Sequence, residues 1–393
     1  MPFVLPPSVL DTDEIALVLA FGRLSVLEAC TVLERAVLRA EAPSERVSVL
    51  NVDHLPTEDV AQLSGAHKCG PLVTRLDSTS GDQSALVDLM LSHLEDKSNV
   101  SLSGYDLEED DYEDIVRSML DGIREGGLKK VRLLRPEGNE LLSEQVLARG
   151  ALDVIAFPYH DGFGLAPTAW VPDAASMRQR GTRKPVPHSD IALSPRLART
   201  LVNIAGLKPG QSLLDPFCGS GTILVEAYGK SLRCLGLDAR ASRVQEAREN
   251  IRWSVGGVDA RGYDIRKGDA RGLSHMLRGT KVDAVVTEPL LLPRLDARPK
   301  TSTAQAMVAE SAEIYNDALA SMADSIQPDG RIVVVVPVVQ TMDGDEVTLT
   351  LEGRKLGLRP YQPGPVGFEY PMRLSFESTR WVRRAVYVFE PRS

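Results

Sequence analysis

The sequence has no apolar run that reaches the ~18 residues needed to cross a bilayer, and its few cysteines form no recognisable pattern. The cysteines number four, and their spacing is neither that of a disulfide framework nor that of a zinc site. The first residues turn acidic early and lack a basic stretch, so we expect no signal peptide. These absences predict a cytoplasmic protein with reduced thiols, no membrane contact and no metal.

Charge is distributed unevenly along the 393 residues, whose net charge is −9. Residues 1–174 hold 14 Lys and Arg against 30 Asp and Glu, a net charge of −16, whereas residues 175–393 carry +7. A polyanion such as RNA is therefore expected to bind the second half. For the first half, the alternatives are a solvated acidic surface and a surface for a protein partner.

The length allows two domains, and no repeat of solenoid period is present. Residues 1–174 mix strand patterns (14–22, 46–53, 99–107, 153–171) with helical spacing (25–41, 111–127), which predicts a smaller α+β region. Residues 175–190 are rich in Arg, Lys and Pro and are expected to form a basic linker.

Residues 191–393 alternate between apolar strands and helices. The expected strands are 212–215, 233–238, 264–270, 282–289 and 331–339, and the expected helices are 222–230, 242–253 and 304–326. Continuous apolar strands separated by helices predict an α/β fold of the Rossmann-like type, with a mostly parallel, doubly wound sheet. Residues 379–391 alternate and are expected to add an antiparallel edge strand.

In such a sheet, ligands bind at the carboxyl ends of the strands. Asp215 ends a predicted strand, and Gly219 and Gly221 follow it. The spacing D-x-x-x-G-x-G differs from the G-x-G-x-x-G that cradles a dinucleotide pyrophosphate. It suits a nucleoside that carries an amino acid, with Asp215 near the ammonium group. The alternative is a glycine-rich turn without a ligand.

Three further strand ends carry carboxylates. Asp238 lies 19 residues after Gly219, close to the offset at which an acidic residue binds ribose hydroxyls. Asp269 is suited either to an adenine amino group or to capping a helix. Glu288 lies within the stretch "TEP" that follows the mostly apolar residues 282–286 at the end of the expected strand 282–289. Four such strand ends in order are more specific than any one of them.

The stretches "DPFCGSGTILVEA", "LGLDA", "KGDA" and "LSPRLARTLVNIAGL" resemble the S-adenosylmethionine-dependent RNA methyltransferases associated with THUMP domains. Within that group they most resemble the tRNA guanine-N2-methyltransferases of the archaeal and eukaryotic position-10 type. The resemblance covers roughly 191–339, and "RWVRRAVYVFE" is similar to the family's C-terminal strand. It implies a class I methyltransferase domain, S-adenosylmethionine as the cofactor, tRNA as the partner and methyl transfer to the exocyclic N2 amine of a guanosine.

The resemblance also implies roles for individual residues. The methionine side of the cofactor would contact residues of the glycine-rich turn: Asp215, Phe217, Gly219, Ser220 and Gly221. Asp238 would bind the ribose, Asp269 with Ala270 the adenine, and Ser194 with Pro195 would approach the cofactor.

The sequence departs from the family's pattern at the amine-methylating motif. An Asp- or Asn-Pro-Pro-aromatic motif is usual there, and this chain has "TEPLLLPRL". Glu288 can still accept a hydrogen bond from the target amine, and Pro289 keeps a rigid turn, so both are predicted as catalytic. Leu290, Leu291 and Leu292 stand where the aromatic ring that stacks on the base is expected.

The first 174 residues depart from the pattern too, because they are acidic and show no clear THUMP pattern; a divergent THUMP-like module that positions RNA remains open for them. Their densest basic cluster, Lys129, Lys130, Arg132 and Arg135, marks either an RNA face or an exposed strand edge.

RNA phosphates are expected to bind the linker cluster, which we define as Arg178, Arg180, Arg183 and Lys184. Two alternatives to tRNA methylation stay open. One is methyl transfer to rRNA, DNA, protein or a small molecule, and the other is a protein of the same fold that binds RNA without catalysis.

Overall fold

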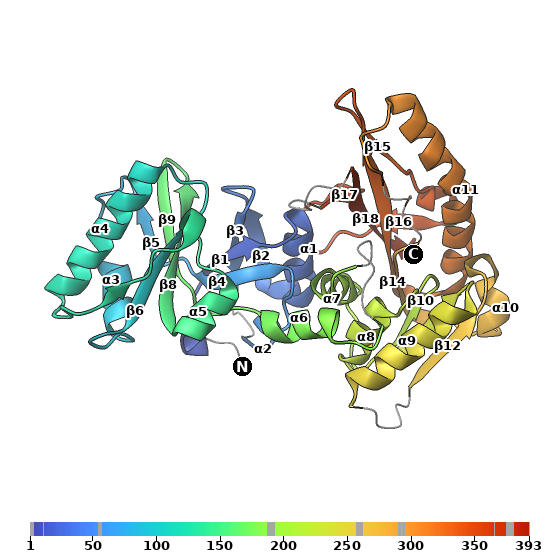
Figure 1. The fold of residues 1–393 in the computed structure, drawn as a ribbon, viewed down its shortest axis with the longest axis horizontal. Helices are drawn as coiled ribbons and strands as arrows, with labels where there is room; N and C mark the ends of the chain where they lie inside the picture. The colour runs from blue at the N-terminus through green and yellow to red at the C-terminus, as the bar shows by residue number, and fades with distance from the viewer. Residues whose placement is uncertain are drawn as a thin grey trace. The chain divides into compact units, whose positions relative to one another are not determined.

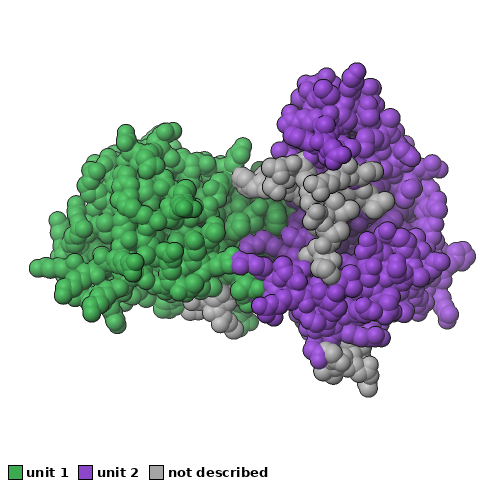
Figure 2. All heavy atoms as spheres, in the orientation of Figure 1, with its two compact units in different colours: residues 1–175, 363–366 green, residues 176–362, 367–393 purple. Residues whose placement is uncertain are grey.

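The chain forms two compact units in a computed structural model (Figure 2). Unit 1 contains residues 1–175 and 363–366, and unit 2 contains residues 176–362 and 367–393. The structure describes residues 4–392 except 11, 54–56, 187–192, 257–261, 290–291, 293–294, 365 and 375–380.

The first sheet of unit 1 is antiparallel, with the order β2-β3-β1-β4. Its strands are β1 (Glu14–Leu19), β2 (Val37–Glu41), β3 (Val47–Val52) and β4 (Ala66–Pro71), and the helices α1 (Arg23–Val32) and α2 (Thr57–Val60) lie between them in sequence. The helix predicted over 25–41 is wrong beyond residue 32. Residues 37–41 pair with β3 instead, and ladder hydrogen bonds to a neighbouring strand outweigh local helical spacing.

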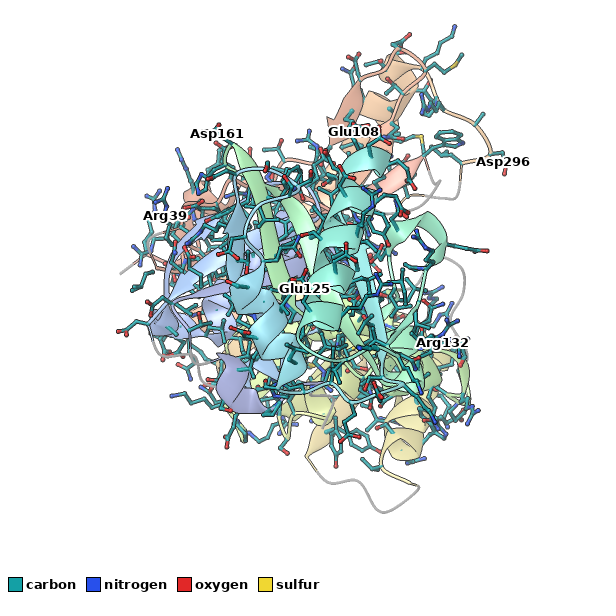
Figure 3. All side chains as sticks on the ribbon, turned by 90° about the vertical axis from the view of Figure 1, so that its left-hand side faces the viewer. Arg39, Glu108, Glu125, Arg132, Asp161 and Asp296 are labelled. Atoms are coloured by element: carbon teal, nitrogen blue, oxygen red, sulfur yellow. The ribbon has the colours of Figure 1, made fainter. Side chains whose placement is uncertain are left out.

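The second sheet of unit 1 is mixed, with the order β5-β9-β8-β6-β7. Its strands are β5 (Thr74–Leu76), β6 (Asn99–Gly104), β7 (Arg132–Leu133), β8 (Ala151–Tyr159) and β9 (Gly162–Pro167). The α-helices of this part are α3 (Ser84–Leu91), α4 (Glu109–Glu125) and α5 (Ser143–Arg149). The helix predicted over 111–127 corresponds to α4, which has an acidic first turn; Figure 3 labels Glu108 before it and Glu125 at its end.

The basic cluster at 129–135 belongs to an edge of this sheet. Arg132 begins β7, which is the last strand in the sheet order, and Arg135 pairs with Glu113 of α4. These contacts favour the exposed strand edge over a dedicated RNA face.

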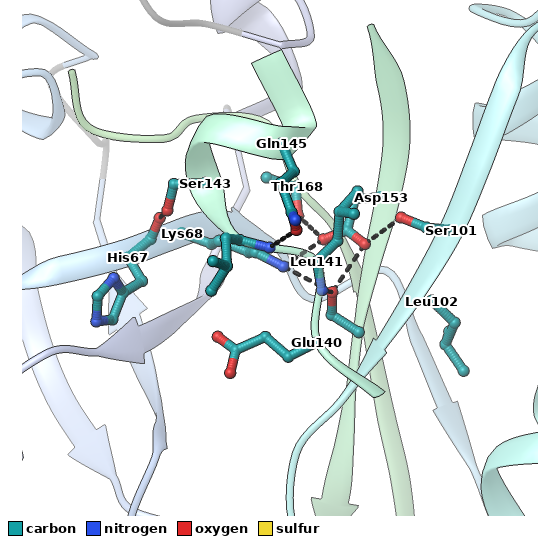
Figure 4. A network of polar contacts seen from close by, with 12 residues as sticks. His67, Lys68, Ser101, Leu102, Glu140, Leu141, Ser143, Gln145, Asp153 and Thr168 are labelled. Atoms are coloured by element: carbon teal, nitrogen blue, oxygen red, sulfur yellow. Dashed lines mark hydrogen bonds and ion pairs between the residues drawn. The ribbon is translucent and has the colours of Figure 1, made fainter. Parts of the chain in front are cut away.

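A buried ion pair connects β4 to the second sheet (Figure 4). Lys68 and Asp153 are both 0% exposed, and Nζ of Lys68 lies 2.7 Å from Oδ2 of Asp153. Nζ also donates to Ser103, while Asp153 accepts from Ser101, Ser103 and Thr168. The hydrogen bonds offset the cost of burying two charges, so the network fixes how these strands pack.

Unit 2 is built on one large sheet with the order β12-β11-β10-β13-β14-β18-β16. Figure 1 labels several of its strands, among them β10, β14 and β18. The parallel strands are β10 (Ser212–Asp215), β11 (Arg233–Asp238), β12 (Tyr263–Lys267), β13 (Val282–Thr287) and β14 (Ile326–Gln340). The antiparallel additions are β15 (Glu346–Thr348), β16 (Leu358–Pro360), β17 (Met372–Arg373) and β18 (Val382–Pro391). This is the predicted α/β fold with a mostly parallel sheet.

The antiparallel orientation expected near residues 379–391 is confirmed, but its position at the sheet edge is wrong. β18 lies between β14 and β16, and residues Ala385–Phe389 are buried. An apolar stretch buried on both faces is stabilised more in the interior of a sheet than at its edge.

The helices of this part of the chain are α6 (Ala174–Thr182), α7 (Pro195–Ile204), α8 (Thr222–Tyr228), α9 (Ala241–Ser254), α10 (Leu273–Leu277) and α11 (Thr301–Ser325). The start of the expected linker is therefore helical. The core of unit 2 packs α11 against residues of β13, β14 and β18. Among the residues described, no helix combines the length and apolarity that crossing a membrane requires.

Candidate functional site

The glycine-rich turn begins where β10 ends and leads into α8. Gly219 and Gly221 both have positive φ, +50° and +82°, which explains why glycine occupies these positions. A Cβ built on Gly221 would lie 3.0 Å from Cβ of Ala247 on α9. A Cβ on Gly219 would meet no heavy atom of the described residues within 4 Å. Gly221 thus serves helix packing, and Gly219 borders open space.

Asp215, the last residue of β10, is 2% exposed. Its Oδ1 accepts hydrogen bonds from the hydroxyl of Thr287 at 2.7 Å and from the backbone N–H of Phe217 at 3.1 Å. Burial raises the pKa of Asp215 to about 7, although these two hydrogen bonds lower it. The negative charges of Asp238 and Glu288 add to the rise of the pKa. A buried carboxyl that titrates near neutrality is suited to a cationic partner.

Asp238, at the end of β11, contacts the glycine-rich turn directly. Its Oδ2 accepts from the backbone N–H of Gly219 at 3.1 Å, and its Oδ1 accepts from that of Arg240 at 2.9 Å. The ends of β10 and β11 are therefore joined at one place, as strand-end reasoning predicted.

Ser220 and Phe217 complete the turn. The side chain of Asn250, which is fully buried on α9, donates from Nδ2 to the carbonyl of Ser220 at 2.8 Å. Phe217 is partly buried and packs against the core of unit 2. The turn is held from both sides, which preorganises it for a ligand.

Asp269 follows β12 and caps the short helix η4 (Ala270–Gly272). Its carboxylate accepts from the backbone N–H of Arg271 and pairs with that guanidinium at 2.7 Å. These hydrogen bonds to Arg271 lower the pKa of Asp269. Its side chain is 55% exposed, while Ala270 is buried. Capping, one of the two predicted roles, is confirmed; adenine binding stays a prediction.

Ser194 is the N-cap of α7, and its hydroxyl accepts from the backbone N–H of Leu197 at 3.2 Å. Pro195 occupies the first helical position, where its missing N–H costs nothing. Contact between this helix start and a cofactor stays a prediction.

Glu288 follows β13, the strand next to β10, and is 12% exposed. Nε of Arg384, on β18, donates to its Oε1 at 2.6 Å. Burial raises the pKa of Tyr315 on α11, and the Glu288 carboxylate adds to the rise. The predicted catalytic carboxylate thus has a cationic partner that sequence analysis did not identify.

The residues after Glu288 are only partly described. Pro289 is buried. Leu292 is 7% exposed and packs in the core of unit 2. This packing explains why an apolar residue stands at position 292. Leu290 and Leu291 lie outside the described residues.

The linker cluster is divided by the structure. Arg178 and Arg183 are exposed. Arg180 donates from Nε to Oε1 of Glu226 at 2.7 Å, and Glu226 is 1% exposed. Lys184 is buried and donates to the hydroxyl of Thr222 at 3.1 Å; burial lowers the pKa of Lys184 to about 8. Arg180 and Lys184 hold α8 in place, which limits the predicted phosphate contacts to Arg178 and Arg183.

All four cysteines are buried and free of disulfides: Cys30, Cys69, Cys218 and Cys234. Burial raises the pKa of the thiols of Cys30, Cys69 and Cys234 to about 12. Burial also raises the pKa of the Cys218 thiol, and the nearby carboxylates of Asp215 and Asp238 raise it further. A thiol nucleophile needs a lowered pKa and access. None of these thiols is suited to covalent catalysis.

Sequence reasoning missed four side chains of this region: Thr287, Asn250, Glu226 and Arg384. Glu226 carried a usable signal, because it is a single acid within the apolar helix "TILVEAY". It pairs with both Arg180 and Arg199. The other three are ordinary polar residues of a strand or helix, and only their partners identify them.

Comparison with known proteins supports the fold and the resemblance. Residues 183–343 match the family model described as the RMKL-like methyltransferase domain. The curated tRNA (guanine(10)-N2)-dimethyltransferase of Methanothermobacter thermautotrophicus is 34% identical over 146 residues, 37% of this chain and 39% of that protein. The enzyme of the same name from Pyrococcus abyssi is 29% identical over 172 residues, 44% of this chain and 46% of that protein.

The chain thus spans less than half the length of these curated relatives in the matched regions. The crystal structure of TrmN from Thermus thermophilus covers 96% of this chain and 99% of its own, with a TM-score of 0.54 and 18% identity. That likeness extends the shared fold to nearly the whole chain. The resemblance of the 191–339 region to this methyltransferase group is confirmed.

Proposed function

We propose that the chain binds S-adenosylmethionine at the carboxyl ends of β10 and β11 and transfers its methyl group to the exocyclic N2 amine of a guanosine in tRNA. The observation that carries the proposal is the hydrogen bond between the N–H of Gly219 and Asp238, which joins two predicted cofactor residues. The match to the methyltransferase family model covers these same residues. We retain the cytoplasm as the expected location, in line with four free thiols.

The residues fit this cofactor chemically. A buried Asp215 with a pKa near 7 lies next to a turn whose Gly219 borders open space. The carboxylate would hold the cofactor's ammonium, and the turn would admit its methionine portion. Asp238 would accept hydrogen bonds from ribose hydroxyls. When bound, the cofactor supplies an electrophilic methyl group on a sulfonium.

Glu288 would hold the target amine. A carboxylate can accept several hydrogen bonds, so pairing with Arg384 is compatible with a bond from the amine. That bond would orient the nitrogen lone pair toward the methyl group, and positioning is the main contribution such a site can make. The base would have to leave its helical stack to enter. Because no cysteine is suited to nucleophilic attack, an amine that reacts directly is favoured over a carbon that needs a covalent intermediate.

Methyl transfer is tested with the full chain, labelled S-adenosylmethionine, and unmodified tRNA and rRNA in parallel. We expect label in N2-methylated guanosine of tRNA, identified by mass spectrometry of nucleosides. Label only in rRNA, or in another nucleoside, would contradict the proposed substrate. Nucleosides from a deletion strain give the matching test in cells.

A second candidate is a cofactor-binding protein without transfer activity. It is favoured by the pairing of Glu288 with Arg384 and by the lack of an aromatic residue directly after Pro289. Cofactor binding without methylation of any RNA pool would support it.

A further inference from the structure

We propose that a basic pocket at the amino ends of the parallel strands of unit 2 binds phosphates of the RNA backbone. This second RNA contact lies opposite the carboxyl ends of the strands, where the cofactor is proposed to bind. The pocket has a volume of about 490 Å³. We call it the amino-edge pocket, because its lining includes the first residues of four parallel strands: Ser212, Arg233, Tyr263 and Val282. This inference rests on the proposed RNA substrate.

The pocket is separate from the cofactor site. The cofactor residues Asp215 and Asp238 end β10 and β11, whereas Ser212 and Arg233 begin the same strands. Since β10 and β11 are parallel, their beginnings share one edge of the sheet and their ends share the other. Strands of four to six residues span roughly 13–20 Å. A change at one edge therefore leaves the other intact.

The charge of the lining favours an anion. Four cationic side chains line the pocket: Arg233, Arg266, Arg278 and Lys281. Among the described residues of the lining, Asp264 is the one acidic side chain. Asp264 pairs with Arg266. Asp283, at the start of β13, accepts from the N–H and hydroxyl of Ser212. The lining as a whole keeps an excess of positive charge.

Arg278 occupies an unusual backbone conformation. It ends α10 with φ +51°, a left-handed position that usually holds glycine, and Gly279 follows with φ +78°. A side chain in this conformation costs about 1 kcal/mol. An arginine placed at such a cost supports a function for its charge.

The exposure of the cations favours a polymer over a small metabolite. All four are exposed, so a phosphate bound there stays partly solvated. Small-molecule sites bury most of their ligand. RNA backbones instead bind along open basic surfaces, and a half-buried ring such as Tyr263 adds a face for a ribose or a base. Because β12 is the outermost strand on its side of the sheet, a structured RNA could pass around it and reach both the amino and the carboxyl ends of the parallel strands.

The test compares two double variants of the full chain. Arg278→Ala with Lys281→Ala removes two cations of the pocket, and Arg354→Ala with Lys355→Ala removes two exposed cations outside its lining. Binding of labelled bulk tRNA is measured at salt concentrations between about 50 and about 300 mM, a range over which phosphate contacts weaken strongly. Each lost phosphate contact should lower the slope of log affinity against log salt by about 0.7–0.9. We expect the pocket variant to lower the log–log slope by about 1.4–1.8 and the control to leave it unchanged.

Two further measurements separate the possible outcomes. Calorimetry with S-adenosylmethionine should give wild-type affinity in both variants, which shows that unit 2 is folded. Titration with inorganic phosphate tests whether the pocket is a site for a small anion and not for the RNA backbone. Phosphate binding to the wild type together with an unchanged tRNA slope in the pocket variant would overturn the proposal, as would equal slopes in both variants. Methyl transfer, assayed on the same preparations, is scored separately, so an inactive protein with a pocket-dependent slope contradicts only the proposed function.

Discussion

Arg384 on β18 donates a hydrogen bond to Glu288 at the end of β13 across 2.6 Å, and both side chains are 12% exposed. The guanidinium offsets the cost of burying the carboxylate. The same contact fixes the direction of the Glu288 side chain beside Asp215, whose carboxyl it affects electrostatically. Glu288 therefore has a structural partner as well as the proposed catalytic role, and the two can be separated.

Glu288→Gln should lose at least about tenfold in methyl transfer, roughly 1.4 kcal/mol of barrier, and keep its cofactor affinity. The amide retains an acceptor oxygen for Arg384 but loses the charge that holds the amine. Its melting temperature should fall less than that of Glu288→Ala, because the amide oxygen still accepts a hydrogen bond from Arg384. Single-turnover transfer and thermal melting are measured on the same preparations.

Glu288→Ala is the companion variant and should lose both transfer and stability, because Arg384 is left buried without this partner. Normal turnover in a stable Glu288→Ala protein would remove Glu288 from the mechanism. Loss of stability alone, with normal turnover of the folded fraction, would show that the ion pair is purely structural.

Cofactor affinity should depend on pH through Asp215, whose pKa is raised to about 7. Below pH 7 the carboxyl is protonated in the free protein and must lose its proton to hold an ammonium. Affinity should therefore fall up to tenfold between pH 7 and pH 6 and level off above pH 8. Calorimetry at each pH measures this, and Asp215→Asn should bind weakly without that dependence. A flat wild-type profile would contradict the assignment.

The same group affects stability with the opposite sign. The unfolded pKa of Asp is about 3.9, so the folded state binds more protons than the unfolded state between about pH 4 and pH 7. The contribution of Asp215 to the free energy of unfolding therefore decreases as pH rises through this window. Denaturant unfolding of wild type and Asp215→Asn should diverge there.

The two glycines of the turn should respond differently to alanine. Gly219→Ala places its Cβ in open space and should cost about 1 kcal/mol of stability, with at least tenfold loss of cofactor affinity. Gly221→Ala places its Cβ 3.0 Å from Ala247 and should lower the melting temperature more. Calorimetry and thermal melting compare the two. Unchanged affinity in a folded Gly219→Ala protein would show that the turn does not contact the cofactor.

The linker arginines should also divide into two groups. Arg178→Ala with Arg183→Ala should lower the salt dependence of tRNA binding by about 0.7–0.9 per lost contact and leave the melting temperature unchanged. Arg180→Ala should lower the melting temperature, because Glu226 is 1% exposed and loses one of its two partners. A change in the salt slope with Arg180→Ala alone would contradict this division.

The sequence by itself determined the parallel sheet of unit 2 and the residues at its strand ends. Apolar strands, glycines and carboxylates follow one another in a local order, and a parallel sheet brings successive strand ends to one edge. Asp215, Gly219 and Asp238 could therefore be predicted to lie together. The caps at Ser194 and Asp269 were equally local, because a capping side chain binds a backbone N–H within three residues.

Only the tertiary structure decided which charged side chains pair across the fold. Arg384 is 96 residues from Glu288, and Arg180 is 46 residues from Glu226. No local pattern encodes such separations, so the sequence predicted a phosphate contact for Arg180 and no role for Arg384. The strand at 37–41 and the interior place of β18 were likewise set by distant partners. Hydrogen bonding and burial between segments far apart in sequence outweighed the local preferences on which sequence reasoning depends.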